Sequence, residues 1–302
     1  MKKILLLIDK IGRKKEVLTL GLQEYLGEKA RVHLARFSDV VMEVDGKNIE
    51  IKVEERDIRE FSLVYFRRAG INYFTLTGTL GVCLKYLNIP FFDNAFAQIG
   101  PAGNKLTSQV RLAIAGLPTI PLFFCWRTKV LENADYIISK FGFPLIAKKT
   151  TSQQGRGVFL VKEKQDFEKI LATDPEGEFF FQKYCPAQKE YRLLVLGEKV
   201  RVWEAKIPTD PKEFRSNVAL GAREEFYNLA DLPSQMEEVA VKAAKTLNIQ
   251  IAGVDLLEEK GTGKVWLLEV NRGPGFTYDK NVSPEIKELA SFFLEELRKE
   301  DE

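Results

Sequence analysis

The chain has 302 residues, of which 45% are hydrophobic and 29% charged, an ordinary composition for a folded protein of two or three domains. Forty-five basic residues against 43 acidic ones give a formal net charge of +2, which is too balanced to indicate a nucleic-acid or membrane surface. The one histidine, His33, excludes a His-rich metal site, and three widely spaced cysteines argue against a disulfide framework or a zinc cluster. We therefore expect a cytoplasmic protein whose chemistry uses Lys, Arg, Asp, Glu and backbone groups.

Residues 1–95 alternate short apolar strands with helical segments, which predicts a small α/β domain with a mostly parallel sheet. Ligands of such sheets lie beyond the carboxyl ends of the strands. Arg67 and Arg68 directly follow the apolar run 63–66, so we expect them to bind substrate, with a solvated loop pair as the alternative. The other expected elements are strands at 3–8, 31–37 and 89–93, helices at 14–28 and 76–87, and a hairpin at 40–53 with Asp45-Gly46 in its turn.

Residues 96–185 predict a linking helix followed by a small α+β unit. The helix ends at Gly116, and a short strand is expected to lead to Pro121. The remaining expected elements are helices at 132–141 and 165–172 and strands at 145–149, 158–161 and 178–184.

Residues 186–302 predict a third section built on paired strands. The strands 190–197 and 199–207 turn at Gly197-Glu198, and a helix at 233–247 carries apolar residues at helical spacing. A second hairpin follows, whose turn is centred on Thr262 between two glycines.

This last hairpin is expected to bring two carboxylates together. A symmetric hairpin centred on Thr262 pairs Asp255 with Glu269, and Asn271 points the same way as Glu269 because side chains alternate along a strand. Opposed like charges destabilise a sheet unless a cation lies between them. Two carboxylates and an amide oxygen suit Mg²⁺, although carboxylates that merely face solvent are an equally good interpretation of the hairpin alone.

The segment "TTSQQGRG" provides groups that a triphosphate needs. Gly155 and Gly157 let backbone N–H groups approach phosphate oxygens, Thr151 and Ser152 add hydroxyl donors, and Lys148 precedes the segment on a strand. It is not a Walker A loop. Taken alone, it is also compatible with an ordinary turn between strands.

Taken together, the order of a lysine, a glycine loop, "FQKY", "EYR", an aspartate and Glu-x-Asn resembles the ATP-grasp superfamily. The stretches "EFRSNVALGA" and "EVNRGPGF" further resemble RimK-like ligases, which add amino acids such as glutamate to a carboxyl terminus. The resemblance covers nearly the whole chain and is strongest over about 104–276. It implies an α/β and α+β protein with the ATP-grasp fold: a pre-ATP-grasp (Rossmann-like) domain at 1–95, a linking helix and lid subdomain at 96–185, and a C-terminal subdomain with a magnesium site at 186–302.

The resemblance also implies a role for each residue that matches the family by position. The implied groups are phosphate-binding Lys105 and Lys148; a mobile loop with Thr151, Ser152, Gly155, Arg156 and Gly157; an adenine-binding hinge at Gln182, Lys183 and Tyr184; a ribose contact at Glu190 with Arg192 in the same motif; magnesium ligands Asp255, Glu269 and Asn271; and acyl-phosphate or substrate contacts at Arg215 and Asn217.

Three departures from the family pattern bear on the substrate. Lys183 replaces an acidic hinge residue, Lys206 stands where a phosphate-binding arginine is usual, and Arg272-Gly273 replaces smaller polar residues. We expect Lys206 to assist phosphoryl transfer, and Arg272, with Arg67 and Arg68, to bind an anionic substrate.

The implied activity is an ATP-dependent carboxylate-amine ligase that uses Mg²⁺, with Mn²⁺ as an alternative, and that forms an acyl phosphate. Its expected partners are an amino acid and a carboxylate-bearing peptide, protein or metabolite. A small-metabolite ligase of the glutathione synthetase, D-alanine ligase or lysine-biosynthesis type, a kinase, and a non-catalytic ATP-binding regulatory module are the alternatives. The sequence leaves open the base that deprotonates the amine and the oligomeric state, a homo-oligomer included.

Overall fold

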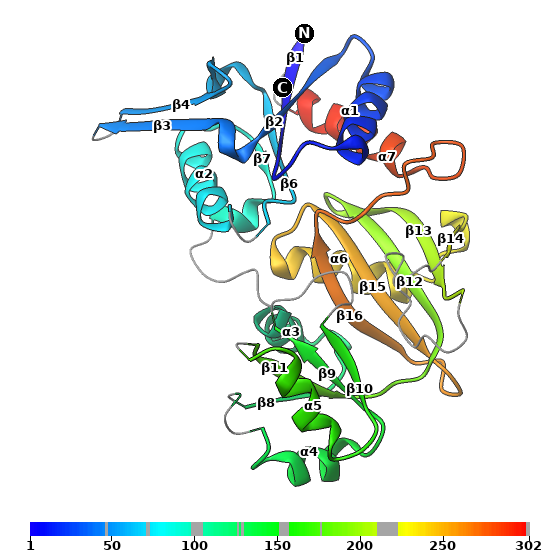
Figure 1. Ribbon diagram of the computed structural model, residues 1–302. Coiled ribbons are helices and arrows are strands. Elements are labelled where there is room, and N and C mark those ends of the chain that lie inside the picture. The colour runs from blue at the N-terminus through cyan, green and yellow to red at the C-terminus, as the bar shows by residue number, and fades with distance from the viewer. Residues whose placement is uncertain are drawn as a thin grey trace.

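The computed structural model describes residues 1–45, 48–70, 73–97, 105–125, 127, 130–150, 157–175, 177–209 and 223–299. Along the chain, the three main sheets have four, four and five strands, and in Figure 1 the five-stranded sheet lies between the two four-stranded ones. Among the described helices, none is long and apolar enough to cross a membrane.

The first sheet is parallel, as predicted. Its strands are β2 (Ala30–Arg36), β1 (Lys2–Ile8), β6 (Leu63–Arg67) and β7 (Phe91–Phe92), in that order across the sheet. Strand β1 is apolar almost throughout because helices cover both faces of the sheet. Helices α1 (Arg13–Leu26) and α7 (Glu285–Arg298) pack on one face, and α2 (Phe74–Tyr86) packs on the other.

The C-terminal helix α7 was not predicted, and it joins the first sheet to the five-stranded sheet. Its Phe293 lies 5.8 Å from Tyr65 and 6.4 Å from Phe92 between ring centroids. The same core includes Leu194 and Ile251 from the five-stranded sheet. Helices near the two ends of the chain, α1 and α7, therefore pack side by side, as Figure 1 shows. The domain limits at 95 and 185 remain predictions.

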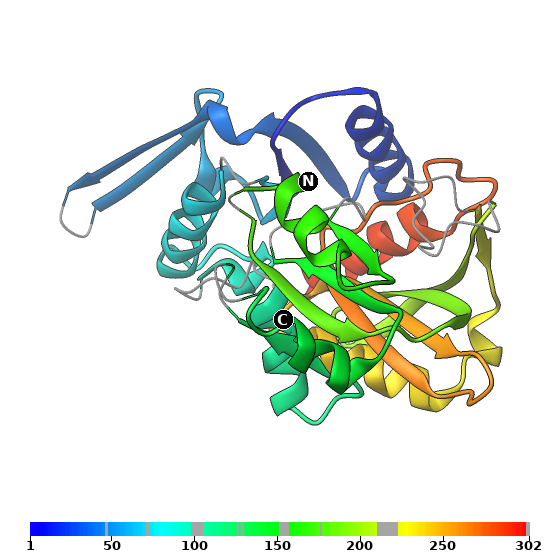
Figure 2. The ribbon, with the colours of Figure 1, turned by 60° about the horizontal axis from the view of Figure 1, so that its bottom comes forward.

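The predicted hairpin at 40–53 is confirmed. Strands β3 (Val40–Asp45) and β4 (Asn48–Val53) pair antiparallel, and β5 (Arg56–Asp57) extends their sheet. Figures 1 and 2 show this hairpin projecting away from the rest of the molecule.

The second four-stranded sheet, called here the small sheet, is antiparallel, and it follows the linking helix α3 (Lys105–Ile114). Its strands are β10 (Val158–Val161), β9 (Leu145–Lys149), β11 (Phe179–Lys183) and β8 (Leu122–Phe124), and its core includes residues of α4 (Ala134–Phe141) and α5 (Asp166–Thr173). The strand expected to lead to Pro121 is wrong: β8 begins after it, and Thr119 forms only an isolated bridge with Leu267. Proline has no backbone N–H to continue a ladder, which explains why the strand starts beyond it.

The five-stranded sheet, called here the large sheet, is also antiparallel. Its strands are β14 (Arg223–Phe226), β13 (Lys199–Ile207), β12 (Ala187–Leu196), β15 (Ile251–Glu259) and β16 (Val265–Arg272), in that order. Helix α6 (Ser234–Leu247) covers one face with the apolar stripe that its sequence predicted, including Met236, Ala243 and Leu247. The short polar strand β14 was not predicted. The face opposite α6 carries the charged residues described next.

Candidate active site

A cavity of about 140 Å³ lies between the small sheet and the large sheet. Apolar side chains from both sheets line part of it, among them Ile146 and Leu257. Its polar lining consists of residues that the sequence selected, namely Lys105, Lys148, Gln182, Lys183, Tyr184, Glu190, Lys206, Asp255 and Glu269. The fold thus brings together side chains from α3, the small sheet and the large sheet.

The pairing of β15 with β16 sets the carboxylates opposite each other, as predicted. Asp255 pairs with Glu269, and Asn271 lies two residues farther along β16. Nearer the turn, however, Leu256 pairs with Leu267, so Leu268 is an extra residue in a β-bulge. The prediction of a fully symmetric hairpin is therefore wrong near the turn. Beyond the bulge, the strands return to the predicted register, so Asp255 still pairs with Glu269.

Three side chains donate hydrogen bonds to Asp255. Arg192 donates from Nε to Oδ1 (2.9 Å) and from Nη2 to Oδ2 (3.0 Å), Lys206 donates from Nζ to Oδ1 (2.6 Å), and Asn271 donates from Nδ2 to Oδ2 (2.8 Å). Burial opposes ionisation of the Asp255 carboxyl, but the two cations hold its pKa well below its ordinary value. Asp255 is therefore a carboxylate with a fixed orientation.

Glu269 and Lys148 form the second charged part of the cavity. Lys105 Nζ donates to Glu269 Oε2 at 2.7 Å. Burial acts against the Glu269 charge, yet Lys105 keeps the pKa of that carboxyl below its usual range. Burial lowers the pKa of Lys148 to about 8, and the nearby Glu269 carboxylate opposes this shift. The cations Lys105, Lys148 and Lys206 thus converge on two carboxylates.

The donor set fits Mg²⁺. The described residues hold no group of three or more His, Cys, Asp or Glu side chains arranged for a metal ion, and the candidate site instead combines two carboxylates with the amide of Asn271. Such hard oxygen ligands are typical of Mg²⁺, which completes its coordination with water and phosphate oxygens. The ammonium groups of Lys105 and Lys206 contact Glu269 and Asp255, respectively.

The end of β11 lines another part of the cavity. Gln182 is buried, and its Nε2 donates to the Ile120 carbonyl at 3.0 Å. The Lys183 ammonium lies 3.7 Å from Glu259 Oε1, so this side chain turns to a carboxylate of β15. Residues 182–184 line the cavity together with the apolar side chains, and their role as an adenine-binding hinge stays a prediction.

The three candidate substrate arginines lie away from the cavity wall, around the loop that follows Asn271. Arg67 is fully buried, donates from Nη2 to the Pro274 carbonyl and stacks 5.0 Å from the Phe276 ring centroid. Gly273 has φ 59°, and a Cβ there would lie 2.9 Å from Arg67 Nη1, so the loop requires glycine. Arg68 donates weakly to the Gly273 carbonyl (3.4 Å), and Arg272 stacks on Phe96. Their role as substrate contacts stays a prediction.

Several predicted site residues cannot be placed. Thr151, Ser152, Gly155, Arg156, Arg215 and Asn217 lie outside the described residues. Gly157 is described, and its carbonyl accepts a hydrogen bond from Lys149 N–H (2.8 Å), which anchors the end of the loop to β9.

Sequence reasoning missed a cluster of carboxylates beside this site. Glu204 of β13, Glu224 of β14 and Glu285 of α7 lie near one another, and Glu204 and Glu285 are buried. The alternation of β13 signals that Glu204 and Lys206 share a face, but β14 and α7 were not predicted, so nothing indicated that three carboxylates meet there.

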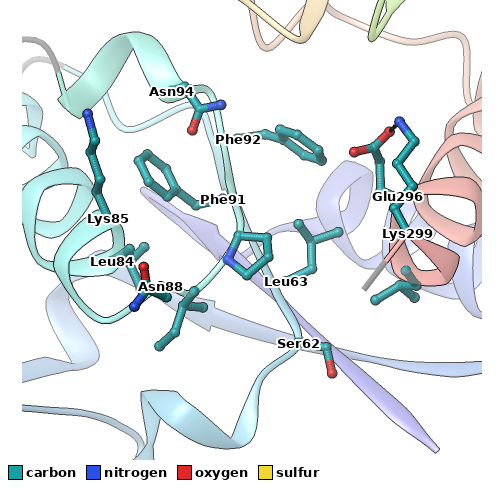
Figure 3. A pocket seen from close by; sticks show the side chains of 13 residues that line it. Ser62, Leu63, Leu84, Lys85, Asn88, Phe91, Phe92, Asn94, Glu296 and Lys299 are labelled. Atoms are coloured by element: carbon teal, nitrogen blue, oxygen red, sulfur yellow. Dashed lines mark hydrogen bonds and ion pairs between the residues drawn. The ribbon is translucent and has the colours of Figure 1, made fainter. Parts of the chain in front are cut away.

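A second cavity, of about 420 Å³, lies at the amino-terminal ends of β6 and β7. Figure 3 shows Phe91 and Phe92 between Lys85 of α2 and the Glu296–Lys299 pair at the end of α7. Although this cavity is larger, none of the predicted site residues is among its described lining. The smaller cavity between the sheets holds the carboxylates and lysines, and we take it as the candidate active site.

Comparisons with known proteins identify the family and support the fold described above. Residues 102–288 match the family described as the RimK-like ATP-grasp domain. The chain is 28% identical over 239 residues to a probable alpha-L-glutamate ligase 2 of Shewanella frigidimarina (strain NCIMB 400), covering 78% of this chain and 74% of that protein. It is also similar to the ATP-grasp ligase PsnB complexed with minimal precursor, with a TM-score of 0.74 and 16% identity over 98% of this chain and 100% of that one. PsnB complexed with a phosphomimetic variant of minimal precursor, Mg and ADP has a TM-score of 0.72 and 15% identity over 99% of both chains. The predicted fold is confirmed.

Proposed function

Because the chain belongs to the RimK-like ATP-grasp family, we propose that it is an ADP-forming ligase that joins the amine of L-glutamate to a carboxylate of a peptide or protein. The observation that carries this proposal is the opposed pair Asp255 and Glu269 at one end of an apolar cavity, each held by a lysine. A free carboxylate is a poor electrophile, so the reaction begins with transfer of the γ-phosphoryl group of ATP to it.

The cavity offers a place for each part of ATP. The adenine would lie against the apolar walls at 182–184, and Glu190 would accept from the ribose hydroxyls. The phosphates would lie among Lys105, Lys148 and Lys206, whose ammonium groups neutralise the charge on the transferred group.

Asp255, Glu269 and Asn271 would hold the magnesium ion. When bound, Mg²⁺ offsets the negative charge of the phosphate oxygens during transfer. Lys105 and Lys206, which contact these carboxylates, would then also reach the phosphate oxygens.

The acceptor is proposed to be an acidic peptide segment. Arg68 is exposed just beyond the carboxyl end of β6, where parallel sheets bind ligands, and Arg67 and Arg272 add positive charge behind it. In PsnB, by its description, a precursor is bound. A carboxylate-rich segment matches this charge.

The test uses hydroxylamine as a surrogate amine with Mg-ATP and glutamate-rich peptides. We expect peptide hydroxamate and ADP in equal amounts, and a glutamyl-extended peptide when L-glutamate replaces hydroxylamine. Glu269→Ala should reduce both products about 100-fold or more, in line with loss of transition-state charge stabilisation. The control Glu225→Ala changes an exposed glutamate of β14 and should retain activity. ATP turnover without hydroxamate, whatever the peptide, would contradict an acyl-phosphate ligase.

A further inference from the structure

Among the described residues, a buried carboxylate near the candidate active site, Glu204, lacks a hydrogen-bond partner. The Glu204 side chain is 1% exposed, and neither of its carboxylate oxygens has a hydrogen-bond partner within the described chain. Removing a carboxylate from water without compensation is costly, so such a group is expected to bind a proton or a cationic group.

Two further carboxylates complete the cluster, and one loop residue fixes both. Thr277 N–H donates to Glu285 Oε2 at 2.7 Å, and the Thr277 hydroxyl donates to Glu224 Oε2. Ser283 Oγ also donates to Glu285 Oε2 at 2.9 Å. Glu224 is only half-buried, so the cluster runs from an accessible edge at Glu224 to the buried Glu204.

The cluster lies on the same sheet face as the candidate phosphate site. Glu204 pairs across the sheet with Arg192, and Arg192 pairs with Asp255 on the next strand. Because adjacent strands are about 4.8 Å apart, Glu204 and Asp255 are separated by about 10 Å in the sheet. A molecule that touches the phosphates could therefore reach the cluster.

The charges around Glu204 favour a cation there. Burial, and then repulsion from Glu285, raises the pKa of Glu204 to about 8, with Arg192 and Lys206 acting in the opposite direction. Burial raises the pKa of Glu285 to about 7, and that of Glu224 is raised as well. A cationic group placed among the three would relieve their repulsion, and an ammonium group needs only acceptors of this kind.

We propose that Glu204, Glu224 and Glu285 form the subsite for the ammonium group of the amine substrate, which enters at Glu224 and gives up its proton to Glu204. This inference rests on the proposed function and supplies the base that its chemistry requires.

The step balances without another reactant. The ammonium passes one proton to the Glu204 carboxylate, and the nitrogen lone pair attacks the acyl-phosphate carbon. A C–N bond forms, the C–O bond to phosphate breaks with its electron pair on the leaving oxygen, and the second nitrogen proton goes to the departing phosphate. Glu204 then returns its proton to solvent.

The decisive comparison uses two amines, because hydroxylamine is neutral near pH 7 and needs no base. In Glu204→Gln, amide formation with L-glutamate should fall about 100-fold, while hydroxamate formation stays within about threefold of the wild type. Glu225→Gln, on the neighbouring solvent-facing position of β14, should leave both rates unchanged. Equal loss of both products in Glu204→Gln, or no loss of either, would overturn the inference while the proposed function stands. A wild type that forms neither product would overturn the proposed function itself.

A binding measurement tests the subsite without turnover. Calorimetry on the protein loaded with Mg²⁺ and a non-hydrolysable ATP analogue compares L-glutamate with glutarate, which lacks the ammonium group. We expect L-glutamate to bind about tenfold more tightly, and Glu204→Gln to lose this preference. Equal affinity for the two acids in the wild type, or a preference that survives in Glu204→Gln, would contradict an ammonium subsite.

Discussion

At the residue scale, the two carboxylates of the candidate site, Asp255 and Glu269, differ in the number of cations that they contact. The Asp255 carboxylate accepts hydrogen bonds from Arg192 and Lys206, two mostly buried cations. Glu269, opposite it, has one cationic partner, Lys105, whose side chain is 22% exposed. The two carboxylates have the same chemistry, but Asp255 neutralises two mostly buried cations, whereas Glu269 neutralises one partly exposed cation.

The stability of the protein without ligands should reflect this difference. Asp255→Asn removes the carboxylate that both buried cations contact, and we expect it to lower the free energy of unfolding by about 3 kcal/mol. Glu269→Gln should cost about 1 kcal/mol or less, because Lys105 can turn towards water. Urea denaturation of both variants measures the two values, and equal losses would contradict the assigned difference.

At the scale of elements, helix α7 has more structural importance than its late position in the chain indicates. It packs beside α1 on the first sheet, contributes to the core shared with the large sheet, and begins with Glu285 of the carboxylate cluster. Helix α7 thus connects the packing of the first sheet with the position of Glu285 in the carboxylate cluster.

Truncating the centre of α7 tests this coupling. Phe293→Ala removes a fully buried ring that contacts Tyr65 and Phe92, and we expect a loss of about 3–5 kcal/mol in unfolding free energy. The control Leu20→Ala, on the exposed side of α1, should change stability by about 0.5 kcal/mol or less. Thermal or chemical unfolding followed by circular dichroism gives both numbers, and similar small effects would refute the role of α7.

At the scale of the whole molecule, the candidate nucleotide site belongs to two sheets at once. The cavity takes Lys148 from the small sheet, its carboxylates from the large sheet, and apolar side chains from both. A ligand in this position must hold the two sheets together, whereas the projecting hairpin β3–β4 has no part in it.

Hydrogen exchange should reveal this bridging. On binding Mg²⁺ and a non-hydrolysable ATP analogue, backbone amides of β9, β11, β15 and β16 should exchange more slowly, while those of β3 and β4 should not change. The variant Lys148→Ala should weaken the protection in both sheets together. Protection confined to one sheet would place the nucleotide elsewhere.

The sequence by itself determined the local features of this protein. Although the pairing of Asp255 with Glu269 also depends on an unpredicted bulge at Leu268, alternation along β16 specified that Glu269 and Asn271 share a face, and the apolar run of β1 specified a buried strand. These features depend on residues close together in the chain, so their patterns are legible without the fold. Where the pattern was weak, as in the short strand β14 with three charged residues out of four, the element was missed.

Only the tertiary structure decided which distant residues meet. Lys105, Lys148 and Lys206 come from three different elements, and no spacing along the chain states that they converge on the same two carboxylates. The same holds for α7 on the first sheet and for the burial of Glu204 beside Glu285. Such contacts follow from how whole elements pack, which depends on complementary surfaces far apart in sequence, and a local pattern does not encode them.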